Sequence, residues 1–189
     1  MTRAWLCSST IAAMAIATAV TTPRAWSVPV GASGPQEVLI IRNAEEPKGA
    51  DVHLNDAGKA RAKALAQWIP ATYGKLDALI ASHATPKSKR AAETLEPMAT
   101  ALHLKVQDQF ATEDYKKLAD KLLKDSEFAG KRILVCWNKG DIAKLVKALG
   151  AKDAPAWPDG QYDHIWRLKF DAGKVTLEDS AQKLPSPGK

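Results

Sequence analysis

Residues 37–45 read EVLIIRNAE, a short aliphatic run that passes directly into polar and charged residues. Residues 38–41 are four consecutive aliphatic side chains, most of them β-branched, which is typical of a strand buried on both faces. Such strands belong to parallel sheets that carry helices on both sides. We therefore predict a central strand of an α/β domain here, and we expect functional residues directly after its carboxyl end.

Apolar runs and amphipathic stretches alternate along the chain on the C-terminal side of this strand. Short apolar runs predict further strands over residues 76–81, 103–106 and 133–137. Apolar residues three and four apart predict helices between the strands. The predicted helices are one that Asn55 caps and Pro70 ends, one that begins at Pro86, one over residues 113–123 and one over residues 142–149.

The C-terminal part has a different, alternating pattern. Residues 162–170 alternate between apolar and polar side chains, and a turn at residues 172–173 leads into a short run at 175–177. This pattern predicts an antiparallel hairpin. With the strand-helix-strand repeat before it, the expected fold is a three-layer α/β/α sandwich with a mainly parallel sheet and an antiparallel edge hairpin.

The N-terminal residues have the pattern of a secretory signal peptide. Arg3 provides a positive start, residues 5–20 carry no charge, and Ala25 and Ser27 stand where cleavage would occur. An uncleaved anchor is the alternative, but as a helix this stretch spans only ~24 Å of a ~30 Å hydrocarbon core. We expect a periplasmic or secreted protein without stable membrane insertion. The expected organisation is a signal peptide at 1–27, a linker at 28–36, a domain at 37–178 and a flexible tail at 179–189.

Composition excludes several classes of function. The net charge is +6, but the lysines alternate with acidic residues and no basic run contains aromatic side chains, so we expect no nucleic-acid partner. Cys7 and Cys136 are the only cysteines, and Cys136 falls in a predicted buried strand. No pair of the four histidines has the spacing of metal ligands, so we expect no metal and no cofactor.

Four segments in a fixed order resemble one known family. They are residues 41–45 (IRNAE), 54–62 (LNDAGKARA), 86–94 (PKSKRAAET) and 136–140 (CWNKG). They are similar to the R-H-G/A-E, L-T-x-x-G-x-x-Q-A, S-P-x-x-R-x-x-x-T and W-H-H-G motifs of the histidine phosphatase superfamily, also called phosphoglycerate mutase-like. Arg90 and Thr94 stand in register with the third motif. The resemblance covers about residues 37–170 and implies the fold of that family.

The chain departs from the family at both histidines. Asn43 stands where the resemblance places the nucleophile, and Asn138 stands where it places the histidine that binds the transferring phosphoryl oxygens. The lone pair of an amide nitrogen is delocalised and does not titrate near neutral pH, so asparagine supplies neither a nucleophile nor a general acid. Loss of a covalent nucleophile costs on the order of a millionfold in turnover. We therefore expect a pseudo-phosphatase without useful turnover by the family's route.

The resemblance implies that an anion-binding site remains. Arg42 and Arg90 match the two arginines that bind phosphate in the family, and a guanidinium suits bidentate contact with phosphate oxygens. Ser82, His83 and Lys139 lie near the predicted strand ends and add further donors, and both asparagines keep an NH2 group. The expected ligand is therefore a small phosphorylated or otherwise anionic molecule.

Alternatives exist for these charged residues. Arg42 can instead pair with Glu45, and Arg90 with Glu93 or Glu96. Glu45 is one candidate acid for the leaving group, and Glu113 and Asp114 are two others. The last two also begin a predicted helix, where a carboxylate is favourable without any catalytic role.

Three functions follow from these observations. The first is a binding protein for an anionic ligand, without turnover. The second is an active phosphomonoester hydrolase that uses a substitute nucleophile such as His83. The third is a structural or protein-interaction domain with a dead pocket. The sequence identifies neither the ligand nor a protein partner.

Overall fold

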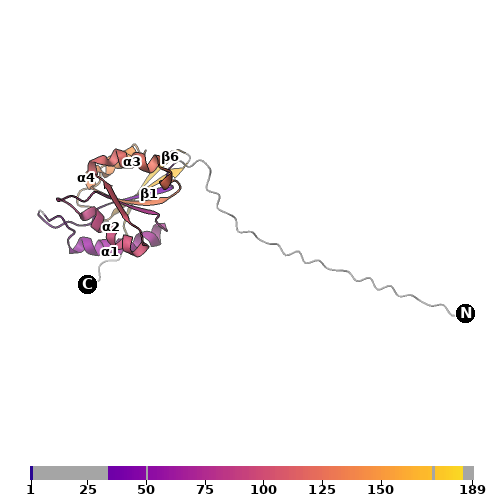
Figure 1. Ribbon diagram of the computed structural model, residues 1–189, viewed down its shortest axis with the longest axis horizontal. Helices are drawn as coiled ribbons and strands as arrows, with labels where there is room; N and C mark the ends of the chain where they lie inside the picture. The colour runs from indigo at the N-terminus through magenta and orange to yellow at the C-terminus, as the bar shows by residue number, and fades with distance from the viewer. Residues whose placement is uncertain (2–33, 50, 172, 185–189) are drawn as a thin grey trace.

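The computed structural model describes Met1 and residues 34–49, 51–171 and 173–184 (Figure 1). The predicted signal peptide and residues 185–189 of the predicted tail lie outside the described residues, except for Met1. The elements in chain order are β1 Glu37–Arg42, α1 Asp56–Tyr73, β2 Ala78–Ser82, α2 Arg90–Leu102, β3 Val106–Phe110, η1 Thr112–Asp114, α3 Tyr115–Lys124, η2 Ser126–Phe128, β4 Arg132–Trp137, α4 Lys139–Ala148, β5 His164–Asp171 and β6 Lys174–Ala181.

The strands form one sheet in the order β3-β2-β4-β1-β5-β6. Strands β1, β2, β3 and β4 pair in parallel, whereas β5 pairs antiparallel with both β1 and β6. The predicted mainly parallel sheet with an antiparallel edge hairpin is confirmed. Strands β1 and β4 are in register up to the pair Arg42 and Trp137. The residues that follow these two strands, Asn43 and Asn138, therefore leave the sheet side by side.

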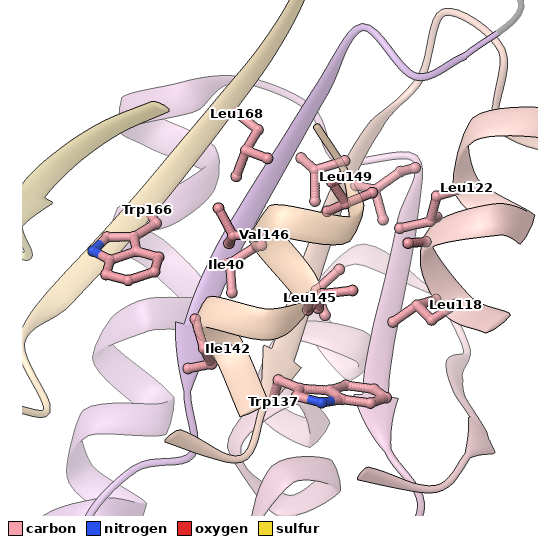
Figure 2. Close-up of a cluster of buried hydrophobic side chains, with 14 of the residues drawn as sticks. Ile40, Leu118, Leu122, Trp137, Ile142, Leu145, Val146, Leu149, Trp166 and Leu168 are labelled. Carbon is pink, nitrogen blue, oxygen red and sulfur yellow. The ribbon is translucent and has the colours of Figure 1, made fainter. Parts of the chain in front are cut away.

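Helices cover both faces of the sheet, which confirms the three-layer arrangement. Helices α1 and α2 lie on one side of the sheet, and α3 and α4 lie on the other (Figure 1). Figure 2 shows the core under α3 and α4, where helix side chains such as Leu118 and Leu145 pack with Ile40, Trp137 and Trp166 from three strands. Burial of one such side chain contributes about 1.5–3 kcal/mol. No helix in the described part of the chain is long and apolar enough to cross a membrane.

Two prolines were expected at the ends of helices, and neither lies there. Pro70 does not end α1, because the helix continues to Tyr73. Proline lacks only its own N–H and its φ is helical, so a last turn can follow it. The helix ends at Gly74, whose φ of 86° suits glycine. Pro86 does not start α2, since it lies in a turn in which the backbones of Thr85 and Ser88 bond to each other.

The third strand and the last strand also differ from their predicted ranges. Strand β3 begins at Val106 rather than at 103, because His103 adopts a left-handed conformation (φ 53°) that ends α2. Strand β6 continues to Ala181, into the segment predicted as a tail. Gln182 beyond it is buried, and its Nε2 donates to the carbonyl oxygen of His164 at 2.7 Å. The chain is thus held to the sheet beyond residue 178.

Candidate functional site

Polar residues at the ends of three neighbouring parallel strands meet at one pocket. Asn43 follows β1, Ser82 ends β2 and Asn138 follows β4. Ligands in α/β sheets bind beyond the carboxyl ends of the strands, where these residues lie. The pocket has a volume of about 260 Å³. It is lined by Asn43, Ser82, His83, Thr85, Lys87, Ser88, Arg90, Ala91, Thr112 and Asn138.

The loop that carries Asn43 is fixed by both helices on its side of the sheet. The backbone N–H of Ala44 donates to Oγ1 of Thr94 at 3.0 Å, and this hydroxyl donates to the carbonyl of Arg90 at 2.7 Å. Thr94 is fully buried, so this bond ties the end of β1 to α2. The N–H of Asn55, the cap of α1, donates to the carbonyl of Glu45 at 3.1 Å. The two residues that follow Asn43 are therefore held in place by α2 and by the cap of α1.

Gly58 allows α1 to approach this loop closely. A Cβ atom at position 58 would lie 2.4 Å from the carbonyl oxygen of Glu45, inside contact distance. The predicted cap at Asn55 is confirmed, because Oδ1 of Asn55 accepts from the N–H of Gly58 at 2.8 Å. The glycine in the second quoted motif is thus required by packing against the strand-end loop.

Arg42 lies beside the pocket rather than in its lining. Its guanidinium carbon is 3.7 Å from the ring centroid of Tyr162, and Nη1 donates to the carbonyl of Gln161 at 3.4 Å. Nε is buried without a hydrogen-bond partner. The alternative pairing with Glu45 is wrong, because the Glu45 carboxylate binds Arg61 at 2.7–3.0 Å. Among the described residues, no carboxylate forms an ion pair with Arg42.

Lys139 is turned away from the pocket by an ion pair. Its Nζ donates to Asp159 at 2.6 Å, and Lys139 is not one of the pocket residues. This hydrogen bond lowers the pKa of the Asp159 carboxyl, and the nearby charge of Arg42 adds to the effect. The carboxylate of Asp159 is therefore ionised near neutral pH and competes with any ligand for Lys139.

Arg90 lines the pocket, and only some of its guanidinium nitrogens have hydrogen-bond partners. Its Nη1 pairs with Glu46 at 2.9 Å and donates to the carbonyl of Asp51 at 3.4 Å. Its Nε is buried and has no hydrogen-bond partner. The alternative pairings with Glu93 and Glu96 are wrong, since Arg90 pairs with Glu46 while Glu93 binds His53 and the N–H of Leu54.

The two asparagines have local structural bonds as well as free donors. Asn43 is buried, and its NH2 donates to the carbonyl of Ala44 at 3.0 Å. Asn138 is the N-cap of α4, and its Oδ1 accepts from the N–H of Gly140 at 3.0 Å. Each NH2 keeps at least one hydrogen for a ligand. The cap was not predicted, although asparagine directly before a helix is its usual signal.

The remaining candidates divide between the pocket and the surface. His83 lines the pocket, and its Nδ1 lies 2.8 Å from the carbonyl oxygen of Asp108. Glu113 is exposed in η1 and is not among the pocket residues, although its neighbour Thr112 is. No group of three or more His, Cys, Asp or Glu side chains within the described ranges is arranged to hold a metal ion.

Cys136 is a core residue, as predicted. It is fully buried on β4, and burial raises the pKa of its thiol to about 12. The thiol is therefore protonated near neutral pH and is no nucleophile.

Sequence reasoning missed Glu46 and Tyr162, which contact the two arginines. Tyr162 is far from Arg42 in sequence, and its only signal was an aromatic side chain in the alternating stretch.

Comparisons with known proteins identify the fold. Neither a family model nor a curated protein matches the sequence. Among solved structures, the chain is similar to the protein histidine phosphatase SixA complexed with tungstate, with 19% identity, 77% of this chain and 97% of that chain covered, and a TM-score of 0.59. It is also similar to phosphoglycerate mutase from Bacillus anthracis, with 14% identity, 79% and 94% covered, and a TM-score of 0.52. The chain therefore has the fold of the histidine phosphatase superfamily, as its motifs indicated.

Proposed function

We propose that the protein binds a phosphate-bearing or other small oxyanionic ligand in this pocket and does not turn it over through a nucleophile at position 43. The observation that carries the proposal is the guanidinium of Arg90, which lines the pocket, and no hydrogen bond between described residues involves its Nη2. A ligand oxygen in the pocket can accept a charge-assisted hydrogen bond from a guanidinium donor that lacks a protein partner. The mature chain acts in the periplasm or outside the cell after removal of its signal peptide.

The other donors around Arg90 suit a tetrahedral oxyanion. The Ser82 hydroxyl and the amides of Asn43 and Asn138 line the same pocket. Helix α4 begins directly after Asn138, and the dipole of the helix favours an anion near this end. SixA, a protein of the same fold, is described in complex with tungstate, which is a tetrahedral oxyanion like phosphate. This likeness supports the proposed ligand class.

The groups present do not supply the usual turnover. Asn43 offers no attacking lone pair, the Cys136 thiol is buried and protonated, and Glu113 lies outside the pocket lining. The carboxylates nearest the arginines, Glu46 and Asp159, are engaged in ion pairs. A pocket with these groups binds an oxyanion through hydrogen bonds and charge. The side chain at position 43 does not attack an ester bond of the ligand.

Arg90→Ala is expected to weaken tungstate and phosphate binding at least about tenfold, because hydrogen bonds to a charged group contribute roughly 1.5–3 kcal/mol each. Isothermal titration calorimetry of the purified protein with each anion measures this. Lys116→Ala is the matched control, since it removes one exposed positive charge on α3 and should leave affinity unchanged. Absence of saturable binding in the wild type, or equal affinity in Arg90→Ala, would contradict the proposal.

Glu46→Gln is expected to raise the affinity for tungstate about threefold. The Glu46 carboxylate lies 2.9 Å from Nη1 of Arg90 and competes with the ligand for it. A partly exposed pair of this kind contributes about 0.2–1 kcal/mol, which sets the size of the gain. Glu96→Gln removes the same charge from α2 without touching Arg90 and is the control for net charge. An unchanged affinity in Glu46→Gln would show that this carboxylate does not occupy the binding position.

A further inference from the structure

His83 is the one imidazole among the residues that line the pocket. It follows β2, where its backbone N–H donates to the carbonyl of Phe110 at 2.7 Å and fixes the start of the connection to α2. Its side chain is about half exposed, so a ligand in the pocket can reach it. The pocket thus presents a nucleophilic side chain directly after β2, whereas asparagines follow β1 and β4.

The hydrogen bond of His83 determines which ring nitrogen is available. Nδ1 lies 2.8 Å from the carbonyl oxygen of Asp108, and a carbonyl can only accept, so Nδ1 carries the hydrogen. In the neutral ring the lone pair is then on Nε2. No hydrogen bond between described residues involves Nε2. The Asp108 carboxylate also lies 3.9 Å from Nδ1.

We propose that Nε2 of His83 accepts a phosphoryl group from an acyl phosphate bound at Arg90. This inference rests on the proposed anion site and adds an activity to it. The Nε2 lone pair attacks phosphorus, an Nε2–P bond forms, and the bond between phosphorus and the acyl oxygen breaks. The electron pair leaves with the carboxylate, which needs no proton. The phosphorylated ring keeps its Nδ1 hydrogen bond to Asp108, and its positive charge faces the Asp108 carboxylate.

The kind of leaving group follows from the position of Glu113, the expected acid, outside the pocket lining. Alkyl phosphates need a proton on the departing oxygen, and Glu113, the expected acid, is not among the pocket residues. An acyl phosphate releases a stable carboxylate, so it reacts without a general acid. Arg90 and the amide groups stabilise the charge on the equatorial oxygens during transfer. Hydrolysis of the phosphorylated histidine then needs only water, which attacks phosphorus as the P–N bond breaks.

The test is to incubate the purified protein with acetyl phosphate and to measure its intact mass and fragment spectra. We expect one phosphoryl group per chain, located on His83. It should be absent in His83→Gln, and its formation should be at least tenfold slower in Arg90→Ala. His53→Gln is the matched control, because His53 is also exposed and bound to an acidic residue but lies outside this pocket. It should be labelled like the wild type.

Absence of the label, or equal labelling of His53 and His83, would overturn the proposal. Calorimetry with tungstate on His83→Gln separates this result from failure of the anion site. Tungstate binding without phosphorylation would remove only the role of His83. Loss of both in the wild type would remove the proposed function as well. A thermal melt of His83→Gln checks folding, which an exposed side chain is expected to affect little.

Discussion

Replacing Asn43 and Asn138 together by histidine is expected to give hydrolysis of p-nitrophenyl phosphate at least about a hundredfold above the wild-type protein. An imidazole at position 43 supplies an attacking nitrogen at the end of β1, in the pocket that contains Arg90. The full value of a covalent nucleophile is on the order of a millionfold. We expect only part of it, because Glu46 occupies Nη1 of Arg90 and Glu113 lies outside the pocket lining. Steady-state kinetics measures the gain.

Three further variants make this result specific. Asn138→His alone should remain inactive, because it restores no nucleophile. Arg90→Ala in the double variant should abolish the gained activity, and His53→Gln, which lies outside the pocket lining, should leave it unchanged. Since Asn138 caps α4, its replacement costs about 1 kcal/mol of stability, so each variant needs a thermal melt. A folded double variant with wild-type activity would show that the pocket no longer has a productive geometry.

Gly58→Ala is expected to lower the free energy of unfolding by about 2 kcal/mol. The new Cβ would lie 2.4 Å from the carbonyl oxygen of Glu45, so either α1 or the loop after β1 must shift. Overpacking costs roughly 1–3 kcal/mol, and so close an approach to backbone belongs at the upper end of this range, which outweighs the gain of about 1 kcal/mol from alanine in a helix. Denaturant unfolding measures the change, which corresponds to a lower Tm by about 4–8 °C.

Gly140→Ala is the matched control for this effect. Gly140 also lies in the first turn of a helix, but a Cβ there would meet only Oδ1 of Asn138 at 3.5 Å, an ordinary contact. Its stability should change by less than about 1 kcal/mol. If Gly58→Ala is as stable as Gly140→Ala, then the close approach of α1 to Glu45 is not a rigid feature of the fold.

The order of elements was predictable because each buried strand is a short aliphatic run. The strands over β1 and β4 agree with their predicted positions almost to the residue. The predictions from sequence were wrong where a local signal conflicts with the path of the chain. Pro70 and Pro86 both suggested helix limits, but one lies in a last helical turn and the other in a turn before α2. Proline restricts a local conformation, and the surrounding packing decides how the chain uses it.

The sequence predicted which residues belong to the candidate site better than it predicted their contacts. Asn43, Asn138, Ser82, His83 and Arg90 were expected near the strand ends, and all line one pocket. The reason is topological, since neighbouring parallel strands end at one edge of a sheet. Arg42, Lys139 and Glu113 were also expected there, but they lie outside the lining.

The sequence alone determined the fold class, the positions of the buried strands and the presence of asparagine rather than histidine at positions 43 and 138, because these depend on residue type and local pattern. The tertiary structure decided which charges are free. Glu46 binds Arg90, Asp159 binds Lys139 and Tyr162 covers Arg42. The structure also decided the tautomer of His83, through the carbonyl of Asp108 on β3. Each of these contacts joins residues far apart in the chain, and only the packing of α/β layers brings them within a few ångströms of each other.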